Sequence, residues 1–307
     1  MRNMPADASS FALRSHGSHT QPSRTGASDR KPSEGTFEGK LKKAADLPVL
    51  NSLWVGDELT YLERLSLQSA MHHGHQFRVY SYAPDTLRGV PEGVEIRDAS
   101  EVMPREKLIS YAECDNGVAL GANLWRYYML AKGLGFWCDL DLVFVRPLDF
   151  AQPYVLGWEY EGWINNAVMF APSESLFVCD LFDLTRPNSR PPWFGPRRSL
   201  QFYWRRWRNG YLGLEDMPWG TYSAGLVTHI VKTRHLEEFV ADPCVFYPVR
   251  WSEARIVYDD ANVVNQRIAE DTRTVHLWHS RLGELAAAPP AEGSWIAEQC
   301  RRFGVEC

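Results

Sequence analysis

Two aspartates separated by one residue lie inside a strongly apolar run of the chain. Asp139 and Asp141 interrupt the segment FWCDLDLVFV, residues 136–145. If this segment is one extended strand, both carboxylates point to the same side, because side chains alternate along a strand. Two converging carboxylates repel each other unless a cation lies between them. The pair therefore predicts a site for a hard divalent ion, Mn²⁺ or Mg²⁺, which can also bind diphosphate oxygens.

An ion held there would offset the charge that builds up on a departing nucleoside diphosphate. A tripeptide of this kind arises by chance about once in one or two chains of this length, so two solvated turn carboxylates are the alternative. The apolar neighbours of Asp139 and Asp141 favour the functional interpretation, since unpaired charges in such surroundings are costly.

Two histidines in the segment VHLWHS, His276 and His279, are further candidates for a metal or phosphate contact. Their three-residue spacing lets both rings share one helix face or diverge from the end of a strand. A single histidine is more often a structural core or surface residue, and that alternative stays open.

The segment PRRSLQFYWRRWRNGY, residues 196–211, interleaves five Arg with five aromatic residues. Three interpretations compete: it binds an anionic or lipid-linked acceptor, it contacts a membrane surface peripherally, or it forms a lid whose Arg stems cover apolar surface. No RNP, helix-turn-helix or zinc pattern accompanies it, so we expect no nucleic-acid partner.

The elements that must position these residues alternate between strands and helices. Strands are predicted over residues 47–56, 77–82 and 94–98. Thr60 and Glu63 have the spacing of a capping box, which predicts a helix between the first two strands. A strand–helix–strand order predicts parallel pairing with right-handed crossovers.

A second helix is predicted over about 118–132, and a further strand over 163–171. The pattern as a whole indicates an α/β fold with a central, mostly parallel sheet. We expect one domain over residues 46–285, with an irregular insertion at about 186–211 and a C-terminal extension over 286–307. Residues 1–45 have few large apolar side chains and are predicted to form a disordered tail.

Composition restricts the function classes. The 307 residues carry a net charge of −5, which disfavours a nucleic-acid binder. No CxxC pair supports a zinc site, and no run of about 18 apolar residues or signal-peptide core is present. We expect a bacterial protein located in the cytoplasm or peripherally at the inner membrane. Twelve Trp residues suit a protein that covers sugar rings or amphipathic surfaces.

The stretch NLWRYYMLAKGLGFWCDLDLVFVRP, residues 123–147, resembles the signature of the DXD-containing sugar-transferase family. That family includes α-1,4-galactosyltransferases, yeast-type mannosyltransferases and bacterial capsular-polysaccharide transferases. The positions that fit are Arg126, Tyr127, Gly135, Trp137, Asp139 and Asp141. The resemblance extends more faintly to residues 53–56, 164–171, 224–228 and 275–280. Asn123 stands where the family has Asp, and Leu134 replaces the first glycine of a pair.

The resemblance implies a nucleotide-binding domain of the GT-A type and assigns roles to several residues. Asp139 and Asp141 would hold the metal–diphosphate pair, and Arg126 would reach the diphosphate or donor sugar. The remaining implied donor contacts are Trp54, Val55 and Gly56 at the nucleotide, and Asn123, Asn165 and Asn166 at the sugar. His276, and with less support His279, would add metal contacts.

The activity implied by the resemblance is metal-dependent transfer of a hexose from a nucleotide sugar, a UDP-sugar by expectation, with retention of anomeric configuration. The acceptor would be a glycan, a glycolipid or another hydroxyl compound. No catalytic nucleophile follows from spacing, although Glu159, Glu215 and Asp216 are available carboxylates.

Two alternatives remain at the level of sequence. The first is a haloacid-dehalogenase-like phosphatase, whose apolar DxD nucleophile motif the segment also matches, with Lys232, Asp259 and Asp260 as its further motifs. The second is a non-catalytic sugar-binding scaffold.

Overall fold

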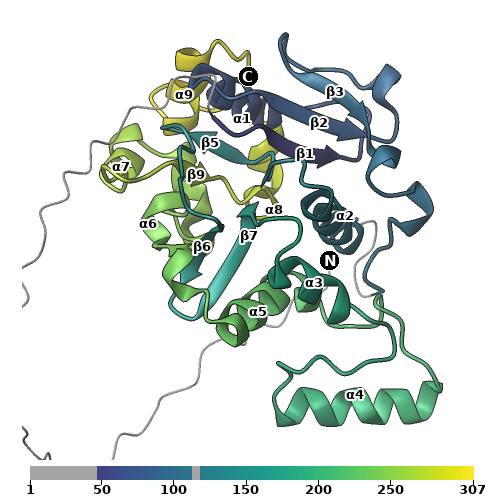
Figure 1. Ribbon diagram of the computed structural model, residues 1–307. Helices are drawn as coiled ribbons and strands as arrows, with labels where there is room; N and C mark the ends of the chain where they lie inside the picture. Colours follow the sequence, from purple (N-terminus) through teal and green to yellow (C-terminus); the bar gives the residue numbers. More distant parts are fainter. Residues whose placement is uncertain (1–46, 113–117) are drawn as a thin grey trace, which may run out of the picture. The chain divides into compact units, whose positions relative to one another are not determined.

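A seven-stranded sheet organises the described residues, 47–112 and 118–307 of a computed structural model. Its strand order is β3-β2-β1-β4-β7-β6-β8, and β5 and β9 form a separate two-stranded sheet (Figure 1). The strands are β1 Leu50–Trp54, β2 Phe77–Ser81, β3 Glu95–Asp98, β4 Phe136–Cys138, β5 Leu142–Phe144, β6 Val155–Tyr160, β7 Trp163–Phe170, β8 Val240–Ala241 and β9 Thr274–His276.

Most pairings in the large sheet are parallel. Strands β3, β2, β1 and β4 run parallel to one another, and β6 runs parallel to β8, whereas β7 is antiparallel to both β4 and β6. The predicted α/β class with a mostly parallel sheet is therefore confirmed. The predicted N-terminal tail lies outside the described residues.

Nine α-helices surround the sheets in the described part of the chain. They are α1 Tyr61–His72, α2 Ala119–Ala131, α3 Leu176–Asp183, α4 Pro196–Asn209, α5 Leu226–Arg234, α6 Pro243–Phe246, α7 Ala261–Asn265, α8 His279–Leu282 and α9 Trp295–Phe303. None of the helices in the described ranges is both long and apolar enough to cross a membrane.

Successive residues of the central strands face two different hydrophobic cores. Leu50 and Val79 pack into the core that contains α1, whereas Leu53 and Tyr80 pack into the core that contains α2. This alternation is expected of strands covered on both faces, because side chains repeat every second residue. The C-terminal helix α9 joins the first core and lies beside α1 (Figure 1).

The start of α1 is fixed locally, as predicted. The Thr60 side chain accepts a hydrogen bond from the N–H of Leu62, and the Glu63 carboxylate accepts one from the N–H of Thr60 at 2.8 Å. This reciprocal arrangement is a capping box, which satisfies backbone donors that the first helical turn leaves unpaired.

The apolar run that holds the two aspartates is not one strand, and that prediction is wrong. Strand β4 ends before Asp139 and β5 begins after Asp141. The N–H of Asp139 still donates to Ala167 on β7 at 2.8 Å, whereas the carbonyl of Asp141 accepts from Leu277 at 2.8 Å. The chain thus passes from one sheet to the other across Leu140. A continuous strand would bury both carboxylates between the two cores, and the turn leaves them partly exposed.

Gly135 allows the chain to enter β4 after the end of α2. Its φ is +120°, and a Cβ at this position would lie 2.5 Å from the carbonyl oxygen of Val49. Only glycine accommodates both the backbone conformation and this approach to β1.

Candidate metal centre

Two carboxylates and one imidazole converge where the two sheets meet. Asp139, Asp141 and His276 each offer a ligand atom, and these atoms all lie within 4.8 Å of one another. The side chains of Asp139 and Asp141 are 28% and 17% exposed, and that of His276 is 7% exposed. This half-buried group could hold a metal ion. Three of the predicted metal-ligand candidates, Asp139, Asp141 and His276, are thus brought together by the fold.

Strand register explains why His276 reaches the aspartates. Leu142 on β5 pairs with His276 on β9 in antiparallel register. His276 is the last residue of its strand, opposite the position where β5 begins, so its ring lies next to Asp141. Sequence spacing places His276 near no particular partner, because the pairing joins segments far apart in the chain.

The turn that holds Asp139 and Asp141 lies next to the carboxyl end of β4, which runs parallel to β1 in the large sheet. Strand β1 lies between β2 and β4, so the chain adds neighbours on opposite sides of β1. In open α/β sheets, ligands bind outside the carboxyl ends of the strands at such a switch point. Asp139 follows the carboxyl end of β4, and Trp54 is the last residue of β1.

Arg126 and Trp137 hold Asp139 from the side of α2. Arg126 donates from Nη2 to Asp139 Oδ1 at 2.9 Å, and the indole N–H of Trp137 donates to the same oxygen at 2.6 Å. The guanidinium also lies 4.3 Å from the centre of the Trp137 ring and donates to the carbonyl of Asn166. Both side-chain bonds use Oδ1, so Asp139 Oδ2 takes part in neither of them.

Asp141 is held by the segment that follows β9. His276 Nε2 lies 3.1 Å from Asp141 Oδ1, and the backbone N–H of His279 donates to Asp141 Oδ2 at 3.0 Å. The His279 ring points elsewhere, because its Nδ1 lies 3.3 Å from the carboxylate of the buried Glu63. The prediction that His279 is a metal ligand is therefore not supported by its position: it contacts Asp141 through its backbone.

The surroundings of Asp139 and Asp141 shift their pKa values in opposite directions. Burial raises the pKa of Asp139 above its ordinary value, and Asp141 adds to this effect while Arg126 opposes it. Burial acts in the same direction on Asp141, but His276 and the N–H of His279 outweigh it and lower the pKa of Asp141 to about 2. Asp141 therefore carries a fixed negative charge at neutral pH.

His276 responds to the same charges. Burial acts to lower the pKa of its imidazole, but Asp141 and Asp139 raise that pKa above 6.5. Its second ring nitrogen, Nδ1, is buried and has no hydrogen-bond partner among the described residues. A cation and a proton would therefore compete for this histidine near neutral pH.

The asparagines predicted at the donor sugar lie beside the metal centre and are bound to one another or to neighbouring residues. Asn166 donates from Nδ2 to Asn123 Oδ1 at 3.0 Å, and its carbonyl accepts from Arg126. Asn165 donates to Glu159 at 2.9 Å and accepts from the N–H of Ala167 at 2.8 Å. Asn123 and Asn166 therefore form one polar cluster with Arg126.

Trp54 ends the first strand at the same sheet edge, and Val55 and Gly56 follow it. Val55 is 38% exposed, and the Trp54 ring folds back over Gly56, where a Cβ would lie 3.0 Å from the indole nitrogen. That nitrogen is buried and has no hydrogen-bond partner within the part of the chain that the structure describes. An unpaired buried donor of this kind is a position where a bound ligand would satisfy a hydrogen bond.

An open pocket of about 630 Å³ shares one residue with the surroundings of His276. Tyr247 lines the pocket, and its ring centre lies 5.7 Å from that of His276. Glu159, Arg250 and Trp251 also line it. Its walls are aromatic and carry both signs of charge, a combination that suits a polar ligand with flat apolar faces.

Two residues near the site, Glu63 and Tyr247, are not predicted as site residues from the sequence. Glu63 was predicted only as a helix cap, and Tyr247 was not predicted at all. Glu63 has no local signal for its contact with His279, since that contact depends on the packing of α1 against the segment after β9. The remaining carboxylates, Glu215 and Asp216, lie beside α4, where Asp216 pairs with Arg205.

Comparison with known proteins adds no family assignment. No protein-family model matches the chain, and no curated protein matches it either.

Proposed function

We propose that the chain is a metal-dependent glycosyltransferase that transfers a hexose from a nucleotide sugar to a hydroxyl group of an acceptor. The observation that carries the proposal is that ligand atoms of Asp139, Asp141 and His276 lie within 4.8 Å of one another, next to the carboxyl end of β4, which runs parallel to β1. This is the part of an α/β sheet where nucleotide ligands bind. A cation there would neutralise charge on a diphosphate leaving group.

Mn²⁺ fits this group of side chains better than Mg²⁺. Two carboxylates suit any hard divalent cation, whereas an imidazole suits transition metals. Asp139 and Asp141 would hold the ion through oxygen, with Oδ2 of Asp139 outside the bonds to Arg126 and Trp137. His276 would contribute a neutral ring nitrogen.

The residues around the ion would orient the donor. Arg126 fixes Asp139 and keeps a guanidinium within reach of diphosphate oxygens, which a planar fork of donors matches. Trp54, Val55 and Gly56 would border the base and ribose, and the buried indole N–H of Trp54 would gain a partner there. A UDP-sugar is the donor we propose, following the sequence resemblance.

The open pocket beside Tyr247 would hold the acceptor or the transferred sugar. Trp251 supplies a flat apolar face that is 45% exposed, and Glu159 and Arg250 supply polar contacts. In the reaction, the bond between sugar C1 and the diphosphate oxygen breaks, a bond from C1 to the acceptor oxygen forms, and the proton of the acceptor hydroxyl passes to the departing diphosphate. Glu159, which lines this pocket and is oriented by Asn165, would position that hydroxyl.

The phosphatase alternative receives less support from the positions of its expected residues. Lys232 donates to the carbonyl of Gly162, and Asp260 caps α7 by accepting from the N–H of Asn262. Among the described residues, the group able to hold a metal contains neither Asp259 nor Asp260. The scaffold alternative makes a different prediction, since it allows donor binding without turnover.

Calorimetric titration of the protein with UDP and GDP, with Mn²⁺ and then with EDTA, tests the proposal. We expect one nucleotide to bind only when Mn²⁺ is present. Equal affinity with Mn²⁺ and with EDTA would contradict a metal-bridged diphosphate site.

A further inference from the structure

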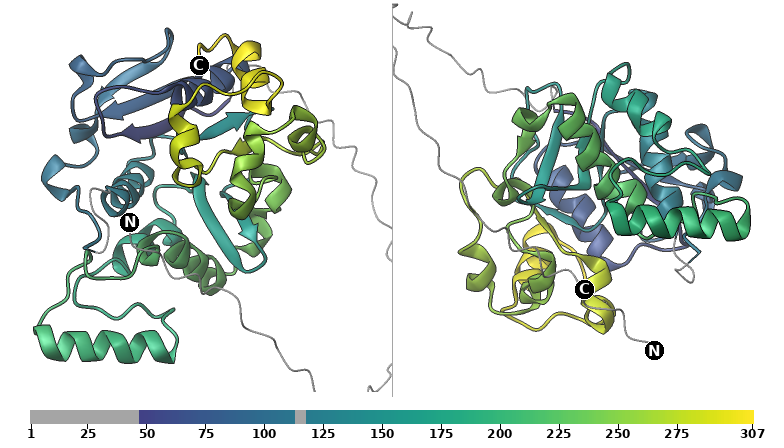
Figure 2. Two further views of the ribbon diagram at one scale, coloured as in Figure 1. Left: turned by 180° about the vertical axis from the view of Figure 1, so that it is seen from behind. Right: turned by 90° about the horizontal axis from the view of Figure 1, so that it is seen from below.

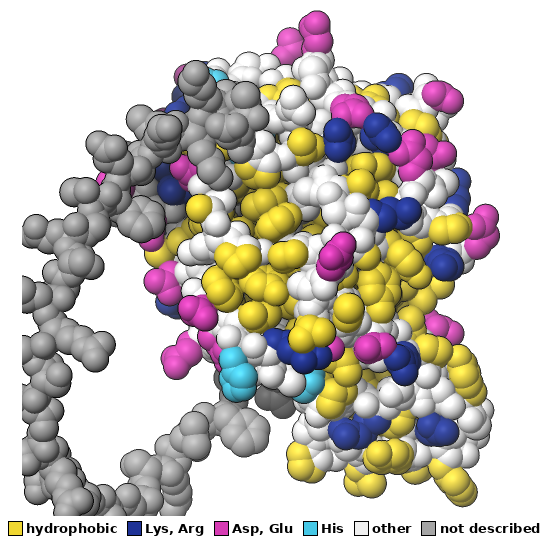
Figure 3. Space-filling model, viewed as in Figure 1, with side chains coloured by type: hydrophobic (Ala, Val, Ile, Leu, Met, Phe, Trp, Pro, Cys, Tyr) yellow, Lys and Arg dark blue, Asp and Glu magenta, His cyan; other side chains and the backbone are white. Residues whose placement is uncertain are grey.

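Helix α4 presents an apolar stripe to solvent. Leu200, Tyr203, Trp204 and Trp207 recur at helical spacing, so they share one face. They are 72%, 56%, 54% and 83% exposed, respectively. The helix projects from the rest of the domain in Figure 1 and in the left view of Figure 2, and hydrophobic side chains follow its outer edge in Figure 3.

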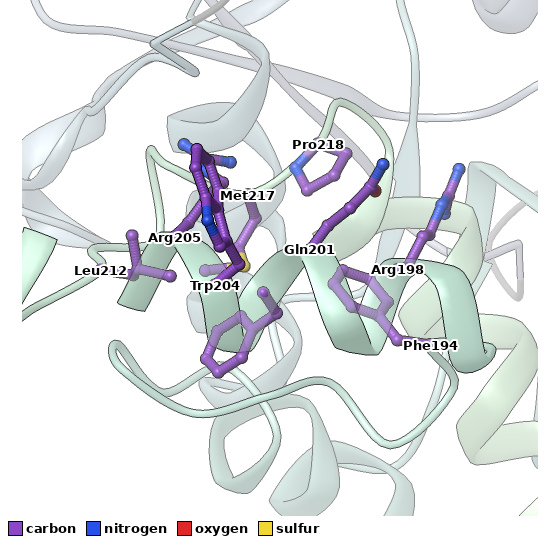
Figure 4. Close-up of a pocket in the computed structure, with 9 residues that line it drawn as sticks. Phe194, Arg198, Gln201, Trp204, Arg205, Leu212, Met217 and Pro218 are labelled. Carbon is purple, nitrogen blue, oxygen red and sulfur yellow. The ribbon is translucent and has the colours of Figure 1, made fainter. Parts of the chain in front are cut away.

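The face of α4 opposite the stripe packs against the rest of the domain. Phe202 is buried in the core that also contains α2, and Arg205 donates to the carbonyl of Asp216. Figure 4 shows the small pocket of about 340 Å³ that lies between α4 and residues 212–218. Trp204 lines one edge of this pocket, whereas Leu200, Tyr203 and Trp207 do not, and none of the four stripe residues is buried in the described structure.

The charge around the stripe has one sign. Residues 184–214 contain seven Arg and no Asp or Glu. At 100° per residue, Arg197 and Arg208 lie on one flank of the stripe and Arg206 on the other. Arg208 remains beside the stripe, with its guanidinium 5.5 Å from the ring centre of Trp204. A partner that covers this face must accept aromatic side chains and offer negative charge.

We propose that α4 docks on the surface of an anionic phospholipid bilayer, with its axis parallel to the membrane plane. Trp and Tyr favour the interfacial layer, and flanking Arg side chains are attracted to anionic headgroups. The helix has 14 residues, and at about 1.5 Å per residue it spans roughly 21 Å, less than the hydrocarbon core of about 30 Å. It can therefore lie on a bilayer but cannot cross one. This proposal does not depend on the chemistry of the metal centre.

Vesicle co-sedimentation of the full chain tests the proposal. We expect binding to vesicles of phosphatidylcholine with phosphatidylglycerol, little binding to phosphatidylcholine alone, and weaker binding at high salt. The double variant Leu200→Ser/Trp207→Ser should lower the partition coefficient at least about tenfold, since it removes two apolar side chains that would be buried. The variant Arg197→Gln/Arg208→Gln should lower it by about thirtyfold, since each basic side chain near an anionic surface contributes roughly fivefold.

Matched controls separate docking from general effects. Leu176→Ser removes a leucine that is 60% exposed on α3, and Arg255→Gln/Arg301→Gln removes the same charge from other exposed sites. Both controls should bind vesicles like the unaltered protein, and circular dichroism should show all variants folded. Absence of vesicle binding would overturn the proposal. Unchanged binding by the stripe variant would also overturn it, as would binding of single-stranded oligonucleotide in place of vesicles, or self-association that the stripe variant abolishes.

Discussion

The imidazole of His279 lies 3.3 Å from the carboxylate of Glu63, and the backbone N–H of the same histidine donates to Asp141 at 3.0 Å. Glu63 is also the capping residue of α1, where it accepts from Thr60. The start of the first helix and the candidate metal centre are therefore joined through His279. A change at Glu63 should reach Asp141 through this histidine, although Glu63 itself is no metal ligand.

The Glu63–His279 pair should make stability depend on pH. Its hydrogen bond to Glu63 raises the pKa of His279 above 6.5, although burial opposes the shift. Burial acts to raise the pKa of Glu63, but His279 and Thr60 outweigh it and lower that pKa below 4.5. The raised pKa of His279 stabilises the fold below pH 6.5, and this stabilisation is lost as the pH rises through the folded-state pKa of the histidine. The lowered pKa of Glu63 stabilises the fold above pH 4.5, and this stabilisation is lost as the pH falls through the folded-state pKa of the carboxyl group.

We therefore expect the difference in unfolding free energy between the unaltered protein and His279→Gln to be largest between pH 4.5 and 6.5. Urea unfolding in EDTA across a pH series measures it. A difference that grows steadily from pH 6 to pH 9 would contradict the pairing.

Metal affinity should fall as the solution is acidified from pH 8 to pH 6. The pKa of His276 is raised above 6.5, so its ring gains a proton at a higher pH than an ordinary histidine, and the proton competes with the ion. Asp141, with its pKa at about 2, stays ionised throughout and contributes no titration in this range. Calorimetric Mn²⁺ titrations of the unaltered protein and of His276→Gln test this. The variant should bind weakly and without the steep pH dependence, whereas the same dependence in both proteins would exclude His276 as the titrating ligand.

Features that depend on neighbouring residues could be predicted from the sequence. The capping box at Thr60 and Glu63 is confirmed because both partners lie within one helical turn. The helix predicted over 118–132 is observed as Ala119–Ala131, and the strand predicted over 163–171 as Trp163–Phe170. Periodicity and glycine positions determine such elements through local sterics.

Features that depend on distant pairing could not be predicted. The segment around Asp139 and Asp141 has the composition of one buried strand, and nothing nearby indicates that its second half pairs with β9. For the same reason the contact of His276 with Asp141 could be expected only from the family resemblance. The insertion at about 186–211 is predicted to be irregular, and that prediction is wrong for Pro196–Asn209, which form α4. Composition alone could not say whether the domain covers the aromatic residues of this helix.

Arg126 should contribute to stability as well as to donor binding. It is 5% exposed and joins Asp139 to the carbonyl of Asn166. Arg126→Gln leaves the carboxylate without its cation, and the loss of a buried pair of this kind costs about 3 kcal/mol. Thermal unfolding should show a clear drop, and Mn²⁺-dependent nucleotide binding should weaken. Arg88→Gln, which removes an exposed pair with Glu58, serves as the control and should leave both measurements unchanged.

Two nearby glycines should differ in their tolerance of a side chain. Gly135→Ala would place a Cβ 2.5 Å from the carbonyl of Val49, at a φ of +120°, whereas the nearest atom to a Cβ at Gly133 is 3.6 Å away at a φ of +65°. Gly133→Ala should therefore lower the free energy of unfolding by about 1 kcal/mol, the cost of placing a non-glycine residue in the left-handed conformation. Gly135→Ala should cost clearly more, since β1 and β4 must separate. Equal midpoints in urea unfolding would contradict the close approach.

The release of nucleoside diphosphate from a panel of UDP- and GDP-sugars, in Mn²⁺ and then in EDTA, tests the central claim most directly. We expect the unaltered protein to release one nucleoside diphosphate in Mn²⁺ alone. Asp139→Asn and Asp141→Asn should each lower that rate by more than about a hundredfold, beyond the range typical of residues that only support a metal ligand. Asp149→Asn, at the ion pair with Arg273, should retain it. Full activity in both Asp139→Asn and Asp141→Asn, or release that EDTA does not affect, would contradict a metal-dependent transferase centred on these residues.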